Sequence, residues 1–181
     1  AVLGESGSGK SVSAAAVMGL LECPPGRISS GRVLFDGQDL LTLSTNERRQ
    51  FNGKRLGMVF QDALASLNPV YTVGWQIAEV LRVHGDHTRR SAREQAVELL
   101  RRVGIPDSGR RAASYPHQLS GGQRQRVMIA MALSCDPKLL IADEPTTALD
   151  VTVQKEVLDL MADLQTRMGT AIVLISHDLG V

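Results

Sequence analysis

The residues with the clearest chemistry lie near the start of the chain, in a glycine-rich segment. It has the spacing GxxxxGK[ST] and consists of Gly4, Glu5, Ser6, Gly7, Ser8, Gly9, Lys10 and Ser11. Glycines let such a loop curl its backbone N–H groups around a phosphate, and the positive end of the following helix adds to the attraction. In this pattern the lysine reaches the β- and γ-phosphates of a nucleotide, and the hydroxyl ligates Mg²⁺. A chance glycine-rich turn is the alternative; the flanking apolar stub and helical pattern favour phosphate binding.

A pair of carboxylates provides the second half of such a site. The apolar run Leu139–Ala142 ends in Asp143 and Glu144, and Pro145 stops the strand. Alternate residues of a strand point to opposite sides. We therefore expect Asp143 to hold magnesium through water while Glu144 faces an attacking water as general base. Paired acids also occur simply as solvated strand ends, but the phosphate loop in the same chain favours catalysis.

A third segment precedes a helical pattern and consists of Leu119, Ser120, Gly121, Gly122 and Gln123. The glycines expose backbone N–H groups and Ser120 adds a hydroxyl, which predicts a second phosphate-binding surface. In isolation this sequence is more often a simple turn. The chain contains no second phosphate loop to match it, so we expect it to serve a nucleotide held by another subunit.

The elements that must position these residues are predicted from periodicity and turn residues. A helix is expected over residues 11–21, stopped by the Cys23–Gly26 stretch with its prolines. Arg32–Phe35 followed by Asp36 and Gly37 predicts a strand and a tight turn. Three further apolar runs predict strands, and the last two lack polar alternation, as expected of parallel strands buried on both faces: Leu56–Phe60, Leu139–Ala142 and Ala171–Ile175.

The middle of the chain, from Thr72 to Leu133, has helical patterns. One apolar stripe ends at Gly104 and Pro106 and comprises Ala92, Ala96, Leu99, Leu100 and Val103. A second stripe runs from Val153 to Met168, with Asp150 as the expected N-cap and Gly169 as the C-cap. Strands at both ends with a helical middle predict an α/β core that carries a helical insertion.

Composition sets the class of protein. With 181 residues, 43% hydrophobic and 22% charged, the chain is expected to be one globular unit. A net charge of +1 and 3% aromatic residues argue against a nucleic-acid-binding surface. The arginines from Arg82 to Arg126 alternate with acids, which indicates a solvated helix surface. Cys23 and Cys135 have no metal-ligand spacing and are interpreted as reduced thiols.

Two observations concern the ends and the membrane. The chain opens on Ala1-Val2-Leu3 and closes on an apolar strand pattern followed by His177, so neither end looks like a domain boundary. We therefore expect an internal part of a longer protein. No apolar run reaches the ~20 residues that span a bilayer, so a membrane function would require a partner.

Taken in order along the whole chain, these motifs resemble the nucleotide-binding domain of ABC transporters. The phosphate loop, Gln61 after the Leu56–Phe60 strand, LSGGQ, the Asp143-Glu144 strand end, Ala148-Leu149-Asp150 and His177 occur in family order. Within that family the ATP-binding subunits of oligopeptide, dipeptide and nickel importers are the most similar. Softer segments carry that part of the resemblance: Ser66–Val70, Tyr115–Ser120 and Arg124–Leu133.

The resemblance implies roles for further residues. Gln61 would contact magnesium or the lytic water and report to the membrane partner through the loop after it. His177 would hold the γ-phosphate and orient the water of Glu144; a surface histidine at a strand end is the alternative. Asp150 would couple two subunits. The family's adenine-stacking aromatic precedes the phosphate loop, and this sequence has none there; three aromatics lie in the wrong places to replace it, namely Tyr71, Trp75 and Tyr115.

The fold class implied is a P-loop, RecA-like α/β fold with a mostly parallel sheet and an inserted helical subdomain. Residues 1–61 would form the first part of the ATP-binding core, 62–136 the helical subdomain with LSGGQ, and 137–181 the second part of the core. The cofactors would be ATP and Mg²⁺. The reaction would be hydrolysis of ATP to ADP and phosphate by in-line attack of water.

The implied partners are a second ATPase subunit in head-to-tail arrangement, integral membrane permease subunits and an extracytoplasmic substrate-binding protein, with no nucleic acid. The protein would lie on the cytoplasmic face of the cell membrane and energise import, of peptides by resemblance. Three alternatives stay open at this point. A chromosome- or repair-type ATPase would need a long coiled coil between Gln61 and Ser120, a translation-type protein would carry two such domains, and a non-enzymatic module would lack Lys10 or Glu144.

Overall fold

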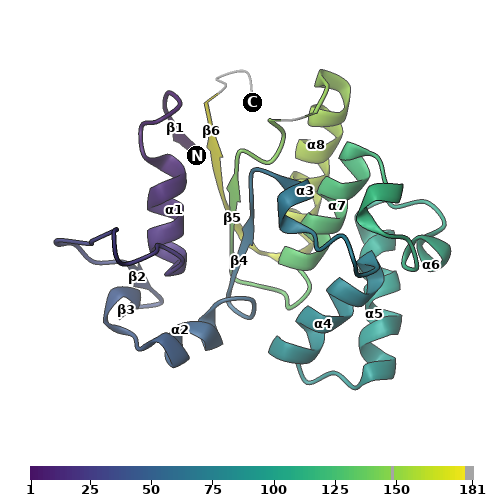
Figure 1. The fold of residues 1–181 in the computed structure, drawn as a ribbon, viewed down its shortest axis with the longest axis horizontal. Coiled ribbons are helices and arrows are strands. Elements are labelled where there is room, and N and C mark those ends of the chain that lie inside the picture. The colour runs from purple at the N-terminus through teal and green to yellow at the C-terminus, as the bar shows by residue number, and fades with distance from the viewer. Residues whose placement is uncertain (148, 178–181) are drawn as a thin grey trace.

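A computed structural model describes residues 1–147 and 149–177, and its centre is a parallel sheet (Figure 1). Within this described part the main sheet has four strands in the order β1 (Val2–Leu3), β6 (Ala171–Ser176), β5 (Leu139–Asp143) and β4 (Leu56–Val59). All three strand pairs are parallel. The expected α/β class and the predicted strands are therefore confirmed.

The apolar stub that leads into Gly4 is expected to be a parallel strand buried like its neighbours, and for its burial this prediction is wrong. Val2 is 42% exposed and Leu3 is 52% exposed. The reason is the position of β1 at the edge of the sheet, where it pairs on one side only, with β6. The central strand β5 meets the prediction: its residues from Leu140 to Asp143 are buried.

Helix α1 (Lys10–Met18) covers one face of this sheet. Its inward residues Ala14 and Met18 form a core cluster with Leu56, Ile141 and Ile175 of the strands. The helix ends earlier than predicted. Gly19 is its C-cap, in the left-handed region with φ 67°, and lies before the prolines in the sequence. The prolines after Cys23 therefore do not determine where the helix stops.

A small hairpin and a short helix lie below α1 in Figure 1. Strands β2 (Leu34–Phe35) and β3 (Gln38–Asp39) are antiparallel, and the turn between them consists of Asp36 and Gly37, both with positive φ. This confirms the predicted strand and turn. A 3₁₀ turn (Leu40–Thr42) leads to α2 (Thr45–Phe51), which begins with a capping box between Ser44 and Glu47.

The middle of the chain is helical, as predicted. It contains α3 (Ala63–Ser66), α4 (Val73–His84), α5 (Arg89–Arg102), α6 (Ser108–Arg111), a 3₁₀ turn (Pro116–Gln118) and α7 (Gly121–Ala132). Hydroxyl side chains cap three of these helices at the N-terminus: Thr72, Thr88 and Ser120. Sequence-local signals thus determine where the helices begin.

A second core cluster forms on the other face of the sheet. It joins the apolar stripe of α5, residues of α4 and α7, and the inward side of α8 (Val151–Met168) to Val59, Leu140 and Ala142 of the strands. Helix α8 begins at the predicted N-cap Asp150, which accepts a bond from Val153 N, and ends at Gly169. Figure 1 shows α7 and α8 on the side of the sheet opposite α1.

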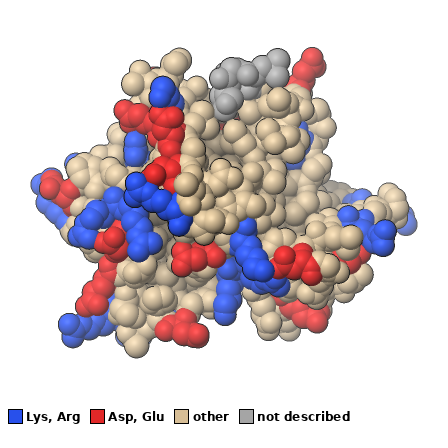
Figure 2. Space-filling model, turned by 180° about the vertical axis from the view of Figure 1, so that it is seen from behind, with Lys and Arg blue, Asp and Glu red and all other residues tan. Residues whose placement is uncertain are grey.

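The charged surface is mixed. On the face in Figure 2, lysine and arginine side chains are interspersed with aspartate and glutamate. Several helical arginines pair with acids one turn away, such as Arg90 with Glu94 at 3.0 Å and Arg82 with Glu79 at 2.8 Å. Such exposed pairs stabilise little. None of the described helices combines the length and the apolar character needed to cross a membrane.

Gly57 in β4 is expected to be indispensable for packing. A Cβ atom there would lie 2.5 Å from the backbone carbonyl oxygen of Ala132, which cannot move aside as a side chain does. We expect Gly57→Ala to lower the free energy of unfolding by about 1–3 kcal/mol. Urea denaturation of the complete protein measures this, with Gly109→Ala as control because nothing lies within 4 Å of a Cβ there. Equal stability of the two variants would contradict the packing argument.

Candidate nucleotide-binding and catalytic site

The predicted site residues follow the carboxyl ends of the parallel strands. The phosphate loop follows β1, His177 follows β6, Glu144 follows β5, and Gln61 lies two residues beyond β4. The register aligns these ends, since Asp143 pairs with Ile175, and Ile175 pairs with Val2. Carboxyl ends of parallel strands are where open α/β sheets bind ligands. The strand order therefore brings four separate segments together at the carboxyl ends of the strands.

The loop of residues 4–9 owes its shape to its glycines. Gly7 and Gly9 have φ values of 81° and 89°, which other residues rarely adopt. Lys10 folds back over the loop, is only 8% exposed, and donates from Nζ to the carbonyl oxygens of Gly4 at 2.7 Å and Glu5 at 2.8 Å. The buried ammonium thus lies against the backbone of the loop, in the segment where the sequence pattern expects phosphate.

Two oxygen-bearing side chains meet beside the loop. Ser11 Oγ donates to Asp143 Oδ1 at 3.0 Å, across 132 residues of sequence. A hydroxyl and a carboxylate are the hard oxygen donors that Mg²⁺ accepts, and this ion takes few ligands from protein. The donor chemistry of Ser11 and Asp143 therefore fits the magnesium predicted from the sequence.

Glu144 is the best-connected residue of the site. Its Oε2 accepts bonds from Gln61 Nε2 at 3.1 Å and Thr147 Oγ1 at 2.9 Å, and lies 3.0 Å from His177 Nδ1. Its Oε1 lies 3.9 Å from Lys10 Nζ. Three predicted residues therefore converge on a fourth. Thr147 was missed by the sequence analysis, although a hydroxyl three residues after a carboxylate in a turn is a recognisable signal.

The position of Glu144 has a different cause from the one predicted. The strand ends at Asp143, and Glu144 has a left-handed φ of 46° while its N–H donates to Ile175 O at 2.9 Å. Strand alternation therefore does not separate the two carboxylates. The left-handed turn does so, because it swings the glutamate out of the strand and toward Gln61 and His177. Such strained backbone often occurs at functional sites.

The environment of Glu144 favours the ionised form. Burial raises its pKa, but the hydrogen bonds from His177 and Thr147, together with the charges of His177 and Lys10, outweigh burial and hold the pKa below its ordinary value. The side chain is only 10% exposed. Glu144 is thus a shielded carboxylate, surrounded by donors and able to accept a proton.

The predicted second phosphate-binding surface lies elsewhere. Ser120 caps α7 in a capping box: Oγ accepts from Gln123 N at 3.3 Å, and Gln123 Oε1 accepts from Ser120 N at 3.2 Å. A hydroxyl that accepts one bond retains its hydrogen for donation. Among the described residues, no hydrogen bond or ion pair joins this segment to the phosphate loop, and α1 and α7 pack on opposite faces of the sheet (Figure 1). The structure does not bring the two motifs together within one chain.

The glycines of this segment also have a packing reason that the sequence analysis missed. A Cβ on Gly122 would lie 2.6 Å from Val153 Cγ1, and one on Gly121 would lie 3.4 Å from Leu149 Cδ2. The start of α7 therefore lies closely against the start of α8. Of the predicted Ala148-Leu149-Asp150 motif, residue 148 lies outside the described residues.

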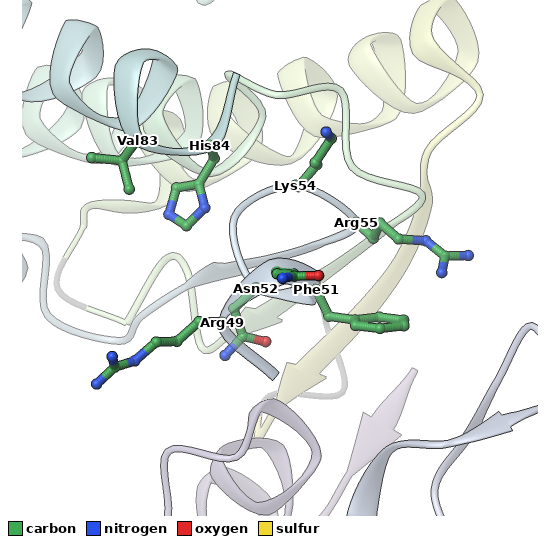
Figure 3. A pocket seen from close by; sticks show the side chains of 8 residues that line it. Arg49, Phe51, Asn52, Lys54, Arg55, Val83 and His84 are labelled. Atoms are coloured by element: carbon green, nitrogen blue, oxygen red, sulfur yellow. The ribbon is translucent and has the colours of Figure 1, made fainter. Parts of the chain in front are cut away.

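A cavity in another part of the structure is not lined by these motifs. It measures about 690 Å³ and Figure 3 shows its lining side chains, which include Arg49, Phe51, Lys54 and His84. Burial lowers the pKa of His84. Arg55 Cζ lies 4.8 Å from the centre of the Phe51 ring, as in a cation–π contact. No residue of the phosphate loop lines this cavity, so it is not part of the candidate nucleotide site.

Comparison with known sequences identifies relatives. The model of the ABC transporter family matches residues 1–147. The oligopeptide transport ATP-binding protein OppD of Bacillus subtilis (strain 168) is 55% identical over 181 residues, covering 100% of this chain and 51% of that protein. The dipeptide transport ATP-binding protein DppD of Escherichia coli (strain K12) is 54% identical over 180 residues, covering 99% and 55%. The chain thus spans about half the length of these relatives.

Solved structures agree with the fold. A dimeric post-hydrolysis state of the ATP-binding cassette MJ0796 bound to ADP and Pi has a TM-score of 0.83 and 31% identity, covering 99% of this chain and 74% of that one. CbiO1 of Clostridium perfringens, part of the ABC transporter complex cbiONQ, has a TM-score of 0.79 and 32% identity, covering 98% and 66%. The expected P-loop fold is confirmed. With its motifs, its strand order and the family match over residues 1–147, this chain belongs to the ABC transporter family.

Proposed function

We propose that this chain is the ATP-binding and ATP-hydrolysing part of an ABC importer of peptides. The observation that carries the proposal is the convergence on Glu144 of Gln61, Thr147 and His177, beside Lys10. A shielded carboxylate next to a phosphate loop is what hydrolysis of a nucleotide needs. The names of the peptide-transporting relatives support the substrate.

In this proposal the loop Gly4–Ser11 cradles the phosphates. Lys10 leaves the carbonyl oxygens of Gly4 and Glu5 and turns its ammonium to the β- and γ-phosphates, a stronger partner because it is charged. Ser11, Asp143 and Gln61 would hold Mg²⁺, which would neutralise charge on the phosphates. The fit of the Ser11–Asp143 oxygen pair supports this assignment.

Glu144 acts as the general base toward the water that attacks the γ-phosphate, and His177 orients that water and the phosphate. The low pKa of Glu144 without nucleotide would make it a weak base. The negative charge of bound phosphates raises the pKa of a neighbouring carboxylate. Nucleotide binding would therefore shift Glu144 toward the basicity that proton removal requires.

Ser120, Gly121, Gly122 and Gln123 serve the nucleotide of a second subunit in a head-to-tail dimer, with Asp150 coupling the subunits. Their separation from the phosphate loop supports this arrangement, as does the dimeric cassette among the structural neighbours. The division into core parts 1–61 and 137–181 and a helical subdomain 62–136 remains a prediction. A permease and an extracytoplasmic binding protein would complete the importer at the cytoplasmic face of the membrane.

A chromosome- or repair-type ATPase fits less well. Between Gln61 and Ser120, the described elements are short helices, the longest of them α5 with 14 residues. Such a segment is too short for a long coiled coil. The peptide-transport relatives also support the import proposal over the translation-type alternative.

Substitution of Lys10 tests nucleotide binding. Lys10→Ala in the complete protein removes a charged contact to the phosphates, so we expect ATP affinity to fall about 10- to 100-fold. Titration with a fluorescent ATP analogue measures this, with Lys155→Ala as control because, among the described residues, Lys155 pairs only with Asp159, on the exposed side of α8. Unchanged affinity in Lys10→Ala would reject the loop as the nucleotide site. ATP-dependent peptide uptake by vesicles carrying the complete importer tests the substrate.

A further inference from the structure

Four buried side-chain atoms among the described residues have no hydrogen-bond partner, and one of them, the amide nitrogen of Gln125, belongs to a residue beside the candidate site. Gln125 of α7 is 4% exposed, and its Nε2 is buried without a hydrogen-bond partner among the described residues. An unpaired buried amide is costly, and native proteins seldom retain one without a reason. Gln76 on α4 shows the usual case: its buried Nε2 donates to the carbonyl oxygens of Asn68 and Tyr71, both at 3.0 Å.

Gln125 lines a cavity that three functional segments share. The cavity measures about 200 Å³, and the other residues that enclose it include Gln61, Asp62, Gly121, Arg124, Pro145 and Leu149. They belong to the Gln61 loop, the first turn of α7 and the segment after Glu144. The space is lined by both polar and apolar atoms and is large enough for ordered water. A residue with an unsatisfied buried donor therefore lines the space between α7, the Gln61 loop and the segment after Glu144.

The Gln61 loop contacts α7 indirectly, through helix α3. Asp62 follows Gln61 and caps α3, since its Oδ1 accepts from Ala65 N at 3.1 Å. Helix α3 in turn packs against α7. Gln61 itself donates to Glu144 Oε2 at 3.1 Å. A shift of α7 relative to this loop therefore changes where the amide of Gln61 lies with respect to the carboxylate.

We propose that Gln125 is a positioning residue that connects α7, the helix that Ser120 caps, to the Gln61 loop: when nucleotide is bound, its amide donates to that loop across the cavity, directly or through water. Engagement of Ser120 and its neighbouring glycines by the partner's nucleotide is thereby transmitted to Gln61 and on to Glu144. The inference rests on the proposed ATPase function and adds a coupling residue to it.

The test replaces the amide while keeping the shape. Gln125→Met is nearly isosteric and removes the unsatisfied donor, so thermal stability should stay equal or rise. The kcat for ATP hydrolysis by the complete importer should nevertheless fall at least about tenfold, with the KM for ATP unchanged. The reason is that the lost hydrogen bond positions Gln61 and takes no part in binding the nucleotide. Gln165→Met, on the exposed side of α8, is the control for the type of substitution.

A double variant shows whether Gln125 acts through Gln61. In a Gln61→Ala background, Gln125→Met should cause no further loss of kcat. Without the side chain of Gln61, a hydrogen bond from Gln125 to this loop can no longer affect Glu144. Wild-type kcat in Gln125→Met, a lowered melting temperature that accounts for the loss, or additive losses in the double variant would each overturn the inference. If the wild-type importer itself does not hydrolyse ATP, the proposed function fails instead.

Discussion

Replacing Glu144 with glutamine is expected to slow ATP hydrolysis by about 10²–10⁴-fold while ATP still binds. The substitution keeps the size of the side chain and removes the oxygen that accepts a proton. It also exchanges a carboxylate, which accepts bonds from Gln61 and Thr147 at one oxygen, for an amide with only one acceptor oxygen. Lys10 and the backbone of the loop remain, so the phosphate-binding surface is unaffected.

Single-turnover hydrolysis and ATP titration of the complete protein separate the two effects. Glu94→Gln is a suitable control, because within the described part of the chain Glu94 pairs only with exposed Arg90 on the surface of α5 and such pairs contribute little. Turnover within about twofold of wild type in Glu144→Gln would remove Glu144 from the role of base. A loss of ATP binding as large as the loss of turnover would instead indicate that the carboxylate is needed to hold the site together.

Mixing two inactive subunits is expected to restore hydrolysis. Helix α7, which Ser120 caps, and helix α1, which follows the phosphate loop, pack on opposite faces of the sheet, so in the proposed head-to-tail dimer each site takes one motif from each of two chains. In a mixed dimer of Glu144→Gln and Ser120→Arg, one composite site carries both lesions and the other carries none. With random pairing and independent sites, recovery should reach about a quarter of the wild-type rate.

The mixture is compared with each variant alone at the same total concentration, and Ser120→Arg must be shown to fold by its melting temperature. A mixture no more active than the separate variants would count heavily against shared sites. A chain that used its own Leu119–Gln123 segment could not regain activity from a partner chain. The rate of the wild-type protein should also rise more steeply than linearly with concentration where the dimer dissociates.

Local patterns in the sequence were sufficient for most elements of the fold. The unalternated apolar runs identified β5 and β6, and the cap at Asp150 with Gly169 defined α8. These features depend on residues a few positions apart, whose preferences act before any tertiary contact forms. The motifs likewise named Lys10 and Glu144 as chemical groups, because the spacing of a phosphate loop is itself local.

Features that depend on distant partners required the tertiary structure. The exposure of β1 follows from its place at the sheet edge, and the orientation of Glu144 follows from a left-handed turn outside the strand. The approach of Gln61 and His177 to one carboxylate depends on the strand order β1-β6-β5-β4, which aligns segments that are far apart in the sequence; Gln61, for example, is 83 residues from Glu144. The burial of the unpaired amide of Gln125 likewise depends on how α7 packs beside the Gln61 loop. Sequence alone determined which groups this protein carries, and packing decided which of them meet, because pairings between distant strands and helices have no signature in the local chain.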